Sequence, residues 1–510
     1  MDTIPLELEK VYELAYKALT KHGCDHLNAD CVATTVTHAE RDGSVSHGLF
    51  RIPGYVASLK SKKVNAVSRP TNNYLTQNAI RVDGDYGFAP VGIKVGLPEL
   101  IKTTSKHGVG VLTITNTHHF AALWHETEAL AENNLIGIAC TAYKPSVAPA
   151  GAKKPLFGTN PISFAWPRKN NTPVVYDMAT STMAMGEVQV AARDGHKVPF
   201  GTGLNKDGEK TDDPNQIANG GVLLTFGDYK GSAIAMMIEL LAAGLVGDLF
   251  SFEAKEEDNN DGGPARGGEF IMALSPELIK TTNKHGVGVL TITNTHHFAA
   301  LWHETEALAQ NNLIGIACTA YKPSVAPAGA KKPLFGTNPI SFAWPRKNKT
   351  PVVYDMATST MAMGEVQVAA RDGHKVPFGT GLNKDGEKTD DPSQIANGGV
   401  LLTFGDYKGS AIAMMIELLA AGLVGDLFSF EAKEEDNNDG GPARGGEFIM
   451  ALSPELIAGK NWNEHAEKFF EQMTSLDGVR LPGQRRHTNR QDKGPRQINS
   501  KLIEKIKSLI

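Results

Sequence analysis

The chain has few of the features that mark a secreted or membrane protein. Its 510 residues include only four cysteines, none in CxxC spacing, which fits a reducing compartment. The N-terminus is charged and helix-periodic, without the basic start and apolar run of a secretory signal. The most apolar segment, GSAIAMMIELLAAGLVG, is interrupted by Glu239 and falls short of the roughly 18 apolar residues that a membrane span needs. We therefore expect a cytoplasmic protein in which this segment is a buried helix.

A strong excess of charge is also missing. The formal net charge is -5 and the pI is about 6.4, so the chain as a whole has no attraction for nucleic acid or for an anionic membrane surface. The composition therefore predicts neither a nucleic-acid partner nor a membrane partner. We expect small-molecule ligands and other protein chains.

Several common site motifs are absent. The Walker pattern fails because Gly231 follows Lys230, and no GxGxxG follows a predicted strand, which excludes a P-loop and a Rossmann fingerprint. WHETEAL is not a zinc motif, because Ala129 occupies the fourth position after His125. The polar loop EAKEEDNNDGGPARGG departs from the calcium-loop spacing. We expect no metal site.

A long internal repeat is present instead. Residues 98–275 match residues 276–453 at an offset of 178, with four differences. A block of this length is the size of a domain, unlike a solenoid repeat of about 20 to 50 residues. PELI stands at the start of both blocks and directly after the second, so a crossover or an assembly error would each produce the pattern. The four differences argue weakly against an assembly error in which one segment was entered twice. Without one of the two blocks the chain would have 332 residues.

The repeat divides the chain into four parts. We expect an N-terminal helical and substrate module (1–97), two copies of a cofactor-binding core (98–275 and 276–453), and a C-terminal helical segment (454–510) that completes the N-terminal module. Within a block, GVGVLTIT, LIGIACTAY, PVVYDMAT and GEFIMAL have the β-branched or apolar character of strands, and GTNP reads as a turn. Asn116 or Thr117 is expected to cap a helix after the first strand, which would place His118 and His119 at its N-terminus. The alternation of strands and helices indicates an α/β fold.

The single-copy segment RDGSVSHGLFRIPGY contains the parts of an acid site. His47 can exchange a proton near neutral pH, the Ser46 hydroxyl can orient it, and the Arg51 guanidinium can hold a carboxylate through two hydrogen bonds. The alternative is a structural histidine in a turn beside a surface arginine.

Three other segments contain candidate anion sites. At the expected helix start, free N-H groups would attract a phosphate or carboxylate and His119 would contact the ligand, unless it is only a packed histidine. In FGDYKGS, Lys230 lies between two glycines just before a helix, although a simple glycine loop explains the pattern nearly as well. In GVRLPGQRR, three arginines surround a Pro-Gly turn and can clamp a nucleotide 2'-phosphate, or form a solvated basic tail.

Six motifs in this order, SHGLFR, NTHHFAAL, FGTNPISF, YDMATS, GDYKGS and RLPGQRR, resemble the malate/L-lactate dehydrogenase family of NAD(P)-dependent oxidoreductases. Within it, HHFAALW and GDLFSFEA are most similar to the Δ1-piperideine-2-carboxylate/Δ1-pyrroline-2-carboxylate reductase branch. The resemblance implies a family-type α/β fold with a non-Rossmann cofactor domain, a homodimer, and hydride transfer between a nicotinamide and C2 of a small 2-substituted acid.

The resemblance also implies roles for residues. His47 is the expected proton donor, oriented by Ser46 and by Glu187 or Asp177. Arg51 and Thr159 are expected to bind the substrate. In some members of the family the residue at the position of His119 has the acid-base role, so the choice between His47 and His119 stays open. The expected cofactor contacts are His119, Phe120, Ala121, Ala122, Leu123, Asp177, Met178, Ala179, Asp228, Tyr229, Lys230, Arg480, Pro482, Gly483, Arg485 and Arg486. Arg485 and Arg486 favour NADP over NAD.

The expected reaction is reduction of a cyclic 2-imino acid such as Δ1-piperideine-2-carboxylate. The alternatives are a malate or L-lactate type 2-hydroxyacid dehydrogenase, and a catalytically impaired cofactor-binding protein.

Because SHGLFR and RLPGQRR are not duplicated, the chain is expected to assemble at most one complete site. The second copies of the repeated site residues are His297, Thr337, Asp355, Met356, Ala357, Lys408 and Gly409. Either core could complete the site, or halves could swap between subunits, and an orphan core would expose an apolar face.

Overall fold

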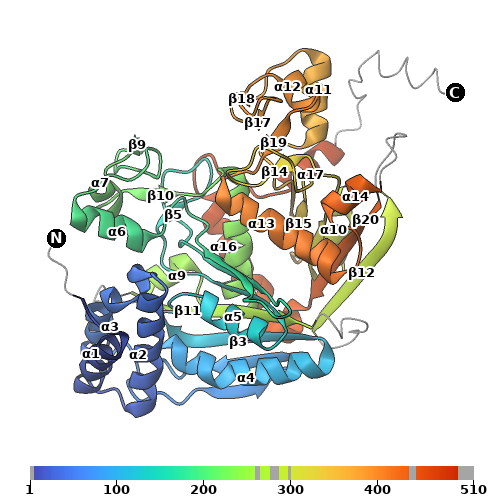
Figure 1. Cartoon of the computed structure of the whole chain (residues 1–510). Coiled ribbons are helices and arrows are strands. Elements are labelled where there is room, and N and C mark those ends of the chain that lie inside the picture. Colours follow the sequence, from blue (N-terminus) through green and yellow to red (C-terminus); the bar gives the residue numbers. More distant parts are fainter. Residues whose placement is uncertain (1–4, 259–264, 276–285, 297–299, 436–443, 492–510) are drawn as a thin grey trace.

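Two similar α/β blocks lie side by side in the computed structural model, with the N-terminal helices packed beside the first (Figure 1). The structure describes residues 5–258, 265–275, 286–296, 300–435 and 444–491. The N-terminal segment, residues 5–97, contains helices α1 (Leu8–Lys21), α2 (His26–Arg41) and α3 (Ile52–Lys60), strands β1 (Thr71–Tyr74) and β2 (Ala79–Asp83), and the start of α4 (Ala89–His107).

The first block is built on a seven-stranded sheet in the order β1-β2-β3-β11-β4-β6-β7. Strand β2 runs parallel to β3, and the other neighbours are antiparallel. The predicted strands are present as β3 (Val109–His118), β4 (Ile136–Thr141), β7 (Val174–Met178) and β11 (Arg266–Leu274), together with β6 (Ile162–Trp166). A smaller sheet has the order β5-β10-β8-β9, formed by β5 (Val147–Ala148), β8 (Gly203–Leu204), β9 (Lys210–Thr211) and β10 (Val222–Leu224).

The second block repeats this design with five strands in its main sheet, in the order β12-β20-β13-β15-β16. These strands are β12 (Val287–His296), β13 (Ile314–Thr319), β15 (Ile340–Trp344), β16 (Val352–Met356) and β20 (Arg444–Leu452). Its small sheet consists of β14 (Val325–Ala326), β17 (Gly381–Leu382), β18 (Lys388–Thr389) and β19 (Val400–Leu402). The predicted α/β fold with a duplicated central block is confirmed.

The helices of the two blocks correspond one to one. In the first block they are α5 (Trp124–Glu132), α6 (Met185–Asp194), α7 (Pro214–Ala218), α8 (Tyr229–Glu239) with the π-helical turn η3 (Leu240–Leu245), and α9 (Ser251–Glu256). In the second they are α10 (Trp302–Gln310), α11 (Met363–Asp372), α12 (Pro392–Ala396), α13 (Tyr407–Glu417) with η4 (Leu418–Leu423), and α14 (Ser429–Glu434). The expected apolar core helix is the buried α8, and no helix in the described ranges is long and apolar enough to span a membrane.

The blocks pack against each other through reciprocal contacts. Lys230 Nζ donates to the Ala357 carbonyl at 2.9 Å, and Lys408 Nζ donates to the Ala179 carbonyl at 2.8 Å. The rings of Phe226 and its own counterpart Phe404 stack at 5.2 Å. Each contact recurs with the two blocks exchanged, which is the pattern of a two-fold, isologous interface between identical subunits. The duplication has therefore produced a pseudo-dimer within one chain.

The exchange of hydroxyl and thioether partners confirms this symmetry. Tyr176 Oη donates to Met415 Sδ at 3.3 Å, and Tyr354 Oη donates to Met237 Sδ at 3.1 Å. The second block is thus packed as a partner and is not an appendage.

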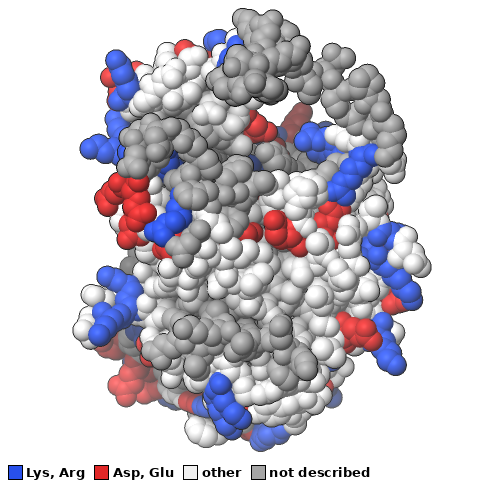
Figure 2. Space-filling model, turned by 90° about the vertical axis from the view of Figure 1, so that its right-hand side faces the viewer, with Lys and Arg blue, Asp and Glu red and all other residues white. Residues whose placement is uncertain are grey.

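Each block keeps one flank that the other lacks. In the first, β2 covers the edge of β3 and Leu112 is 0% exposed, whereas the matching Leu290 on β12 is 56% exposed. At the opposite edge, the Val353 amide of β16 donates to the Pro482 carbonyl of the C-terminal segment at 3.3 Å. Uncharged side chains cover much of the face in Figure 2, and charges of both signs are scattered over it. Leu290 is therefore exposed at the strand edge that has no N-terminal segment beside it.

The C-terminal segment lies between the two blocks. It forms α15 (Pro454–Ala458), α16 (Trp462–Thr474) and α17 (Gln484–Gln491). On α16, Phe469 stacks on Phe250 of the first block at 4.8 Å, and Glu467 accepts two hydrogen bonds from Arg346 of the second block. Arg81 of the N-terminal segment reaches the Ile457 carbonyl at 2.6 Å. The segment therefore joins both cores as well as the N-terminal part.

One local prediction is wrong. Strand β3 continues through His118, and helix α5 begins only at Trp124, so neither Asn116 nor Thr117 caps a helix. The reason is tertiary: β11 pairs with β3 as far as His118, which extends the strand beyond its β-branched core. His119 and the four residues after it form a connecting loop.

Candidate active site

A cavity of about 550 Å3 opens where the N-terminal segment meets both blocks. Its volume is within the range of small-molecule sites. The predicted site residues on its wall are Ser46, His47, Ala121, Ala122, Thr159, Asp177, Met178, Ala179 and Glu187. The wall also includes Gly43, Ser44, Val45, Trp124, Pro161, Ala184, Val190, Ala191, His196, Tyr407 and Lys408. We call this space the His47 cavity.

Two short 3-10 turns position the N-terminal residues of the site. Val45–His47 and Leu49–Arg51 follow one another, so His47 and Arg51 are held close in space. Ser46 Oγ lies 3.2 Å from His47 Nδ1, and Arg51 Nε donates to the Ser46 carbonyl at 2.6 Å. The two terminal nitrogens of Arg51 make no hydrogen bond to any residue that the structure describes, which leaves the fork available for a carboxylate. Arg51 lies next to the cavity and is not itself on its wall.

His119 lies next to the cavity and not on its wall. Its ring centroid is 6.2 Å from that of His47, and its Nδ1 is 2.7 Å from the hydroxyl of the buried Tyr55. Burial raises the pKa of Tyr55 and lowers the pKa of His119 well below its usual value. Both groups are therefore neutral near pH 7, and the hydrogen bond joins a phenol to a neutral imidazole. Phe120 and Leu123 are buried and likewise do not line the cavity.

Burial and a neighbouring positive charge disfavour the protonated form of His47. Burial, followed by the charges of Arg51 and His125, lowers the pKa of His47 to about 4. An anion on Arg51 would offset one of these charges and raise the pKa of His47 again. The site thus couples the binding of a carboxylate to the protonation of its histidine.

Backbone in an unusual conformation lies at and beside the cavity, where Ala121 lines the wall, and a buried carboxyl lines it too. Asn116, His119 and Ala121 have φ values of 54°, 57° and 51°, in the left-handed region that non-glycine residues rarely adopt. Such residues concentrate at functional sites. Asp177 accepts from the Trp124 amide at 3.2 Å, and burial raises the pKa of its carboxyl to about 6. Small side chains and a polar acceptor therefore share one wall of the cavity.

Some predicted cofactor residues are elsewhere. Lys230 faces the second block, where it donates to Ala357 and Ser359, and Tyr229 lines a different cavity of about 440 Å3. Asp228 immediately precedes α8 and does not line the His47 cavity. These three residues are expected to contact the cofactor, and in the structure none of them lines the His47 cavity. The reason is the pseudo-two-fold packing, which crosses the start of α8 over to the other block.

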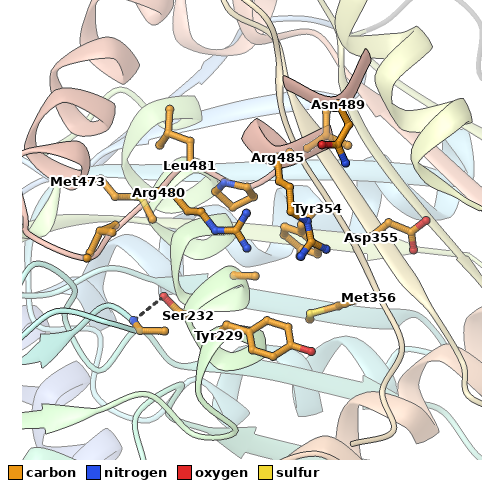
Figure 3. A pocket seen from close by; sticks show the side chains of 17 residues that line it. Tyr229, Ser232, Tyr354, Asp355, Met356, Met473, Arg480, Leu481, Arg485 and Asn489 are labelled. Atoms are coloured by element: carbon orange, nitrogen blue, oxygen red, sulfur yellow. Dashed lines mark hydrogen bonds between the residues drawn. The ribbon is translucent and has the colours of Figure 1, made fainter. Parts of the chain in front are cut away.

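The arginine-rich segment lines this second cavity too. Arg480, Pro482, Gly483 and Arg485 surround it together with Asp355 and Met356, and Figure 3 shows both guanidinium groups pointing toward its interior. No residue of the His47 cavity is shared with it. These residues therefore lie apart from the wall of the His47 cavity, because the segment follows the second block and packs on β16. The side chain of Arg486 lies outside the described residues.

Tyr407 and Lys408 line the His47 cavity in place of Tyr229 and Lys230. They begin α13 and are the second copies of Tyr229 and Lys230. The repeat contained the signal for them, since both copies of GDYKGS were visible, but nothing in the sequence indicated which copy would reach His47. His297, the second copy of His119, lies outside the described residues, as do residues 259–264 of the polar loop. Within the described ranges, no group of three or more potential ligands could hold a metal ion.

Comparison with known proteins places this geometry in a family. The sequence profile of the family described as malate/L-lactate dehydrogenase matches residues 6–284 and again residues 277–507. The first match contains the N-terminal segment and the second contains the C-terminal segment.

Individual relatives agree with the profile. The Δ1-pyrroline-2-carboxylate/Δ1-piperideine-2-carboxylate reductase of Pseudomonas aeruginosa is 41% identical over 273 residues, which are 54% of this chain and 81% of that protein. The crystal structure of Δ1-piperideine-2-carboxylate reductase from Pseudomonas syringae is 40% identical with a TM-score of 0.52, over 56% of this chain and 85% of that one. Malate dehydrogenase from Entamoeba histolytica is 26% identical with a TM-score of 0.52, over 55% and 81%.

Two profile matches, relatives covered over four-fifths of their length and a shared fold lead to one conclusion. This chain belongs to the malate/L-lactate dehydrogenase family of nicotinamide-dependent oxidoreductases, with its central block duplicated.

Proposed function

We propose that the chain reduces a small cyclic 2-imino acid of the Δ1-piperideine-2-carboxylate type in the His47 cavity. The observation that supports this most is that His47 and Ser46 line the cavity together, while Arg51, which lies next to the cavity, donates to the Ser46 carbonyl and keeps its two terminal nitrogens available. Relatives about 40% identical carry the names of reductases of such imino acids.

The proposed chemistry divides between cofactor and protein. When bound, a nicotinamide supplies the hydride for C2 of the substrate. Arg51 holds the substrate carboxylate, and His47 provides the proton that the nitrogen needs as the C=N bond becomes C-N. Because the carboxylate offsets the charge of Arg51, substrate binding raises the pKa of His47 and favours the protonated imidazole. Ser46 orients the ring through Nδ1.

His47 is the better candidate for the acid than His119. The ring of His47 lines the cavity, whereas His119 is bonded to Tyr55 and does not reach the wall. We assign to His119 the support of His47 and of the loop that precedes α5. Glu187 lines the cavity but accepts from the Ala184 amide at 3.2 Å, so we assign it to the wall of the site.

The arginines that favour NADP over NAD are not at the His47 cavity, because Arg480 and Arg485 line the cavity of about 440 Å3. This separation favours a second candidate function, a dinucleotide-binding protein with weak turnover. A malate or L-lactate type dehydrogenase would use the same histidine and arginine.

Oxidation of NADPH and NADH by the full chain distinguishes these functions. The proposal predicts a higher kcat/KM with Δ1-piperideine-2-carboxylate than with pyruvate or oxaloacetate. A preference for either 2-oxo acid supports the dehydrogenase, and dinucleotide binding without turnover of all three supports the second candidate.

A further inference from the structure

The His47 cavity is not completed by the block to which it belongs. Its wall contains Tyr407 and Lys408, which come from the start of α13 in the second block. Lys408 is 4% exposed, and its ammonium group donates to the carbonyls of Ala179 and Ser181. Ala179 itself lines the cavity. The second block therefore fixes a wall of the site that the first block and the N-terminal segment otherwise build.

The contact is specific to the end of β7. Ala179 and Ser181 follow this strand, where Asp177 and Met178 also line the cavity. Carbonyl groups that accept from a buried ammonium are held in a fixed direction, because breaking the bond would leave a buried charge without a partner. Glu187, which also lines the cavity, is an acidic residue whose charge acts on Lys408 and raises its pKa, against the larger effect of burial. Lys408 thus fixes the strand end on which a ligand in the cavity would rest.

Lys230 provides an internal comparison. It is equally buried at 4%, and it donates to Ala357 and Ser359, the second copies of the two residues that Lys408 holds. The surroundings of the two lysines are the same in kind, and burial lowers the pKa of each to about 8. They differ in what lies beyond. The strand end held by Lys408 faces the His47 cavity, whereas the strand end held by Lys230 follows Asp355 and Met356, which line the cavity of Arg480 and Arg485.

We propose that the second block acts as an internal partner subunit, and that Lys408 is the positioning residue of the His47 site while Lys230 has no part in that site. The homodimer expected from the family resemblance is then supplied within one chain. This inference rests on the proposed function for the identity of the substrate. The packing of the two blocks and the contacts of Lys408 do not depend on that function.

The test compares K408M with K230M in the full chain, since methionine keeps the length of the side chain and removes the charge. Both variants lose the same two hydrogen bonds, so both should lose a similar amount of stability in thermal unfolding. K408M should raise the KM for NADPH and weaken NADPH binding by about tenfold or more, and K408R should recover part of this loss. K230M should keep the KM and kcat of the unmodified chain.

Equal losses of activity and NADPH affinity in the two variants, or a greater loss in K230M, would overturn the inference. Calorimetry of NADPH binding separates it from the proposed function. If the unmodified chain turns over none of the substrates, the function fails, but weaker binding in K408M than in K230M still supports the inference. Identical affinities of all three proteins overturn it.

Discussion

His47 and Lys408 line the same cavity, although the whole first block separates them in the sequence. The contact exists because the two blocks pack as the halves of a dimer. The start of α8 in the first block reaches the end of β16 in the second, and the start of α13 in the second block reaches the end of β7 in the first. One cavity obtains the histidine and the other the arginine-rich segment. A duplication that repeats the core without its flanks therefore produces two unequal sites.

The role of Arg51 is tested by R51K. Lysine keeps the charge but loses the fork, so the carboxylate is held by a point charge. The KM for the substrate should rise about tenfold to hundredfold, with NADPH affinity unchanged. Steady-state kinetics and calorimetry measure the two quantities. A rise in the NADPH dissociation constant as large as that in KM would place Arg51 at the cofactor instead.

The charge of Arg51 should also be visible in the titration of His47. In the ligand-free chain the imidazole should titrate near pH 4, and R51M should raise this pKa, because a neighbouring positive charge that disfavours the protonated ring is removed. NMR titration of the histidine resonances, with H47Q to assign the signal, measures the shift. An unchanged or lower pKa of His47 in R51M would mean that the charge of Arg51 does not lower the pKa of His47.

Glu126 should make the protein less stable as the pH rises. Burial and the charge of Asp177 raise the pKa of its carboxyl above the ordinary value of 4.5. The folded chain keeps the proton that the unfolded chain releases above about pH 4.5, so stability falls as pH rises from there toward the folded pKa. E126Q should remove this slope and stabilise the chain by about 1 to 3 kcal/mol at pH 7.

Denaturant unfolding at several pH values measures the effect of E126Q. The control is E132Q, on the exposed last turn of the same helix, which should change little. An advantage of E126Q that is independent of pH, or that shrinks as the pH rises, would contradict the assignment.

Leu112 and Leu290 test the unequal flanks, because they are the same residue in two copies of one strand. L112A should cost about 2 to 5 kcal/mol, as expected for a fully buried leucine, and L290A should cost less than about 1 kcal/mol. Urea unfolding of both variants measures this difference. Equal costs would mean that β12 is covered in solution as β3 is.

Much of this structure can be predicted from local sequence, and the exceptions have a common cause. The strands at GVGVLTIT and GEFIMAL are visible because their apolar and β-branched residues suit a buried sheet. His119 was misplaced because pairing with β11 extends β3 beyond its local signal. The sequence leaves open which lysine reaches the cavity of His47, because Lys230 and Lys408 stand in identical segments and only the packing of whole blocks decides between them.

The central claim is that the chain has one catalytic cavity and that His47 is its acid. The most direct measurement is the kcat of H47A for NADPH-dependent reduction of Δ1-piperideine-2-carboxylate, with H119A beside it and NADPH affinity measured for both. The account predicts that H47A loses about a hundredfold or more in kcat while binding NADPH nearly as well, and that H119A loses less. An H47A chain that keeps most of its kcat, or an H119A chain that loses more, would contradict it.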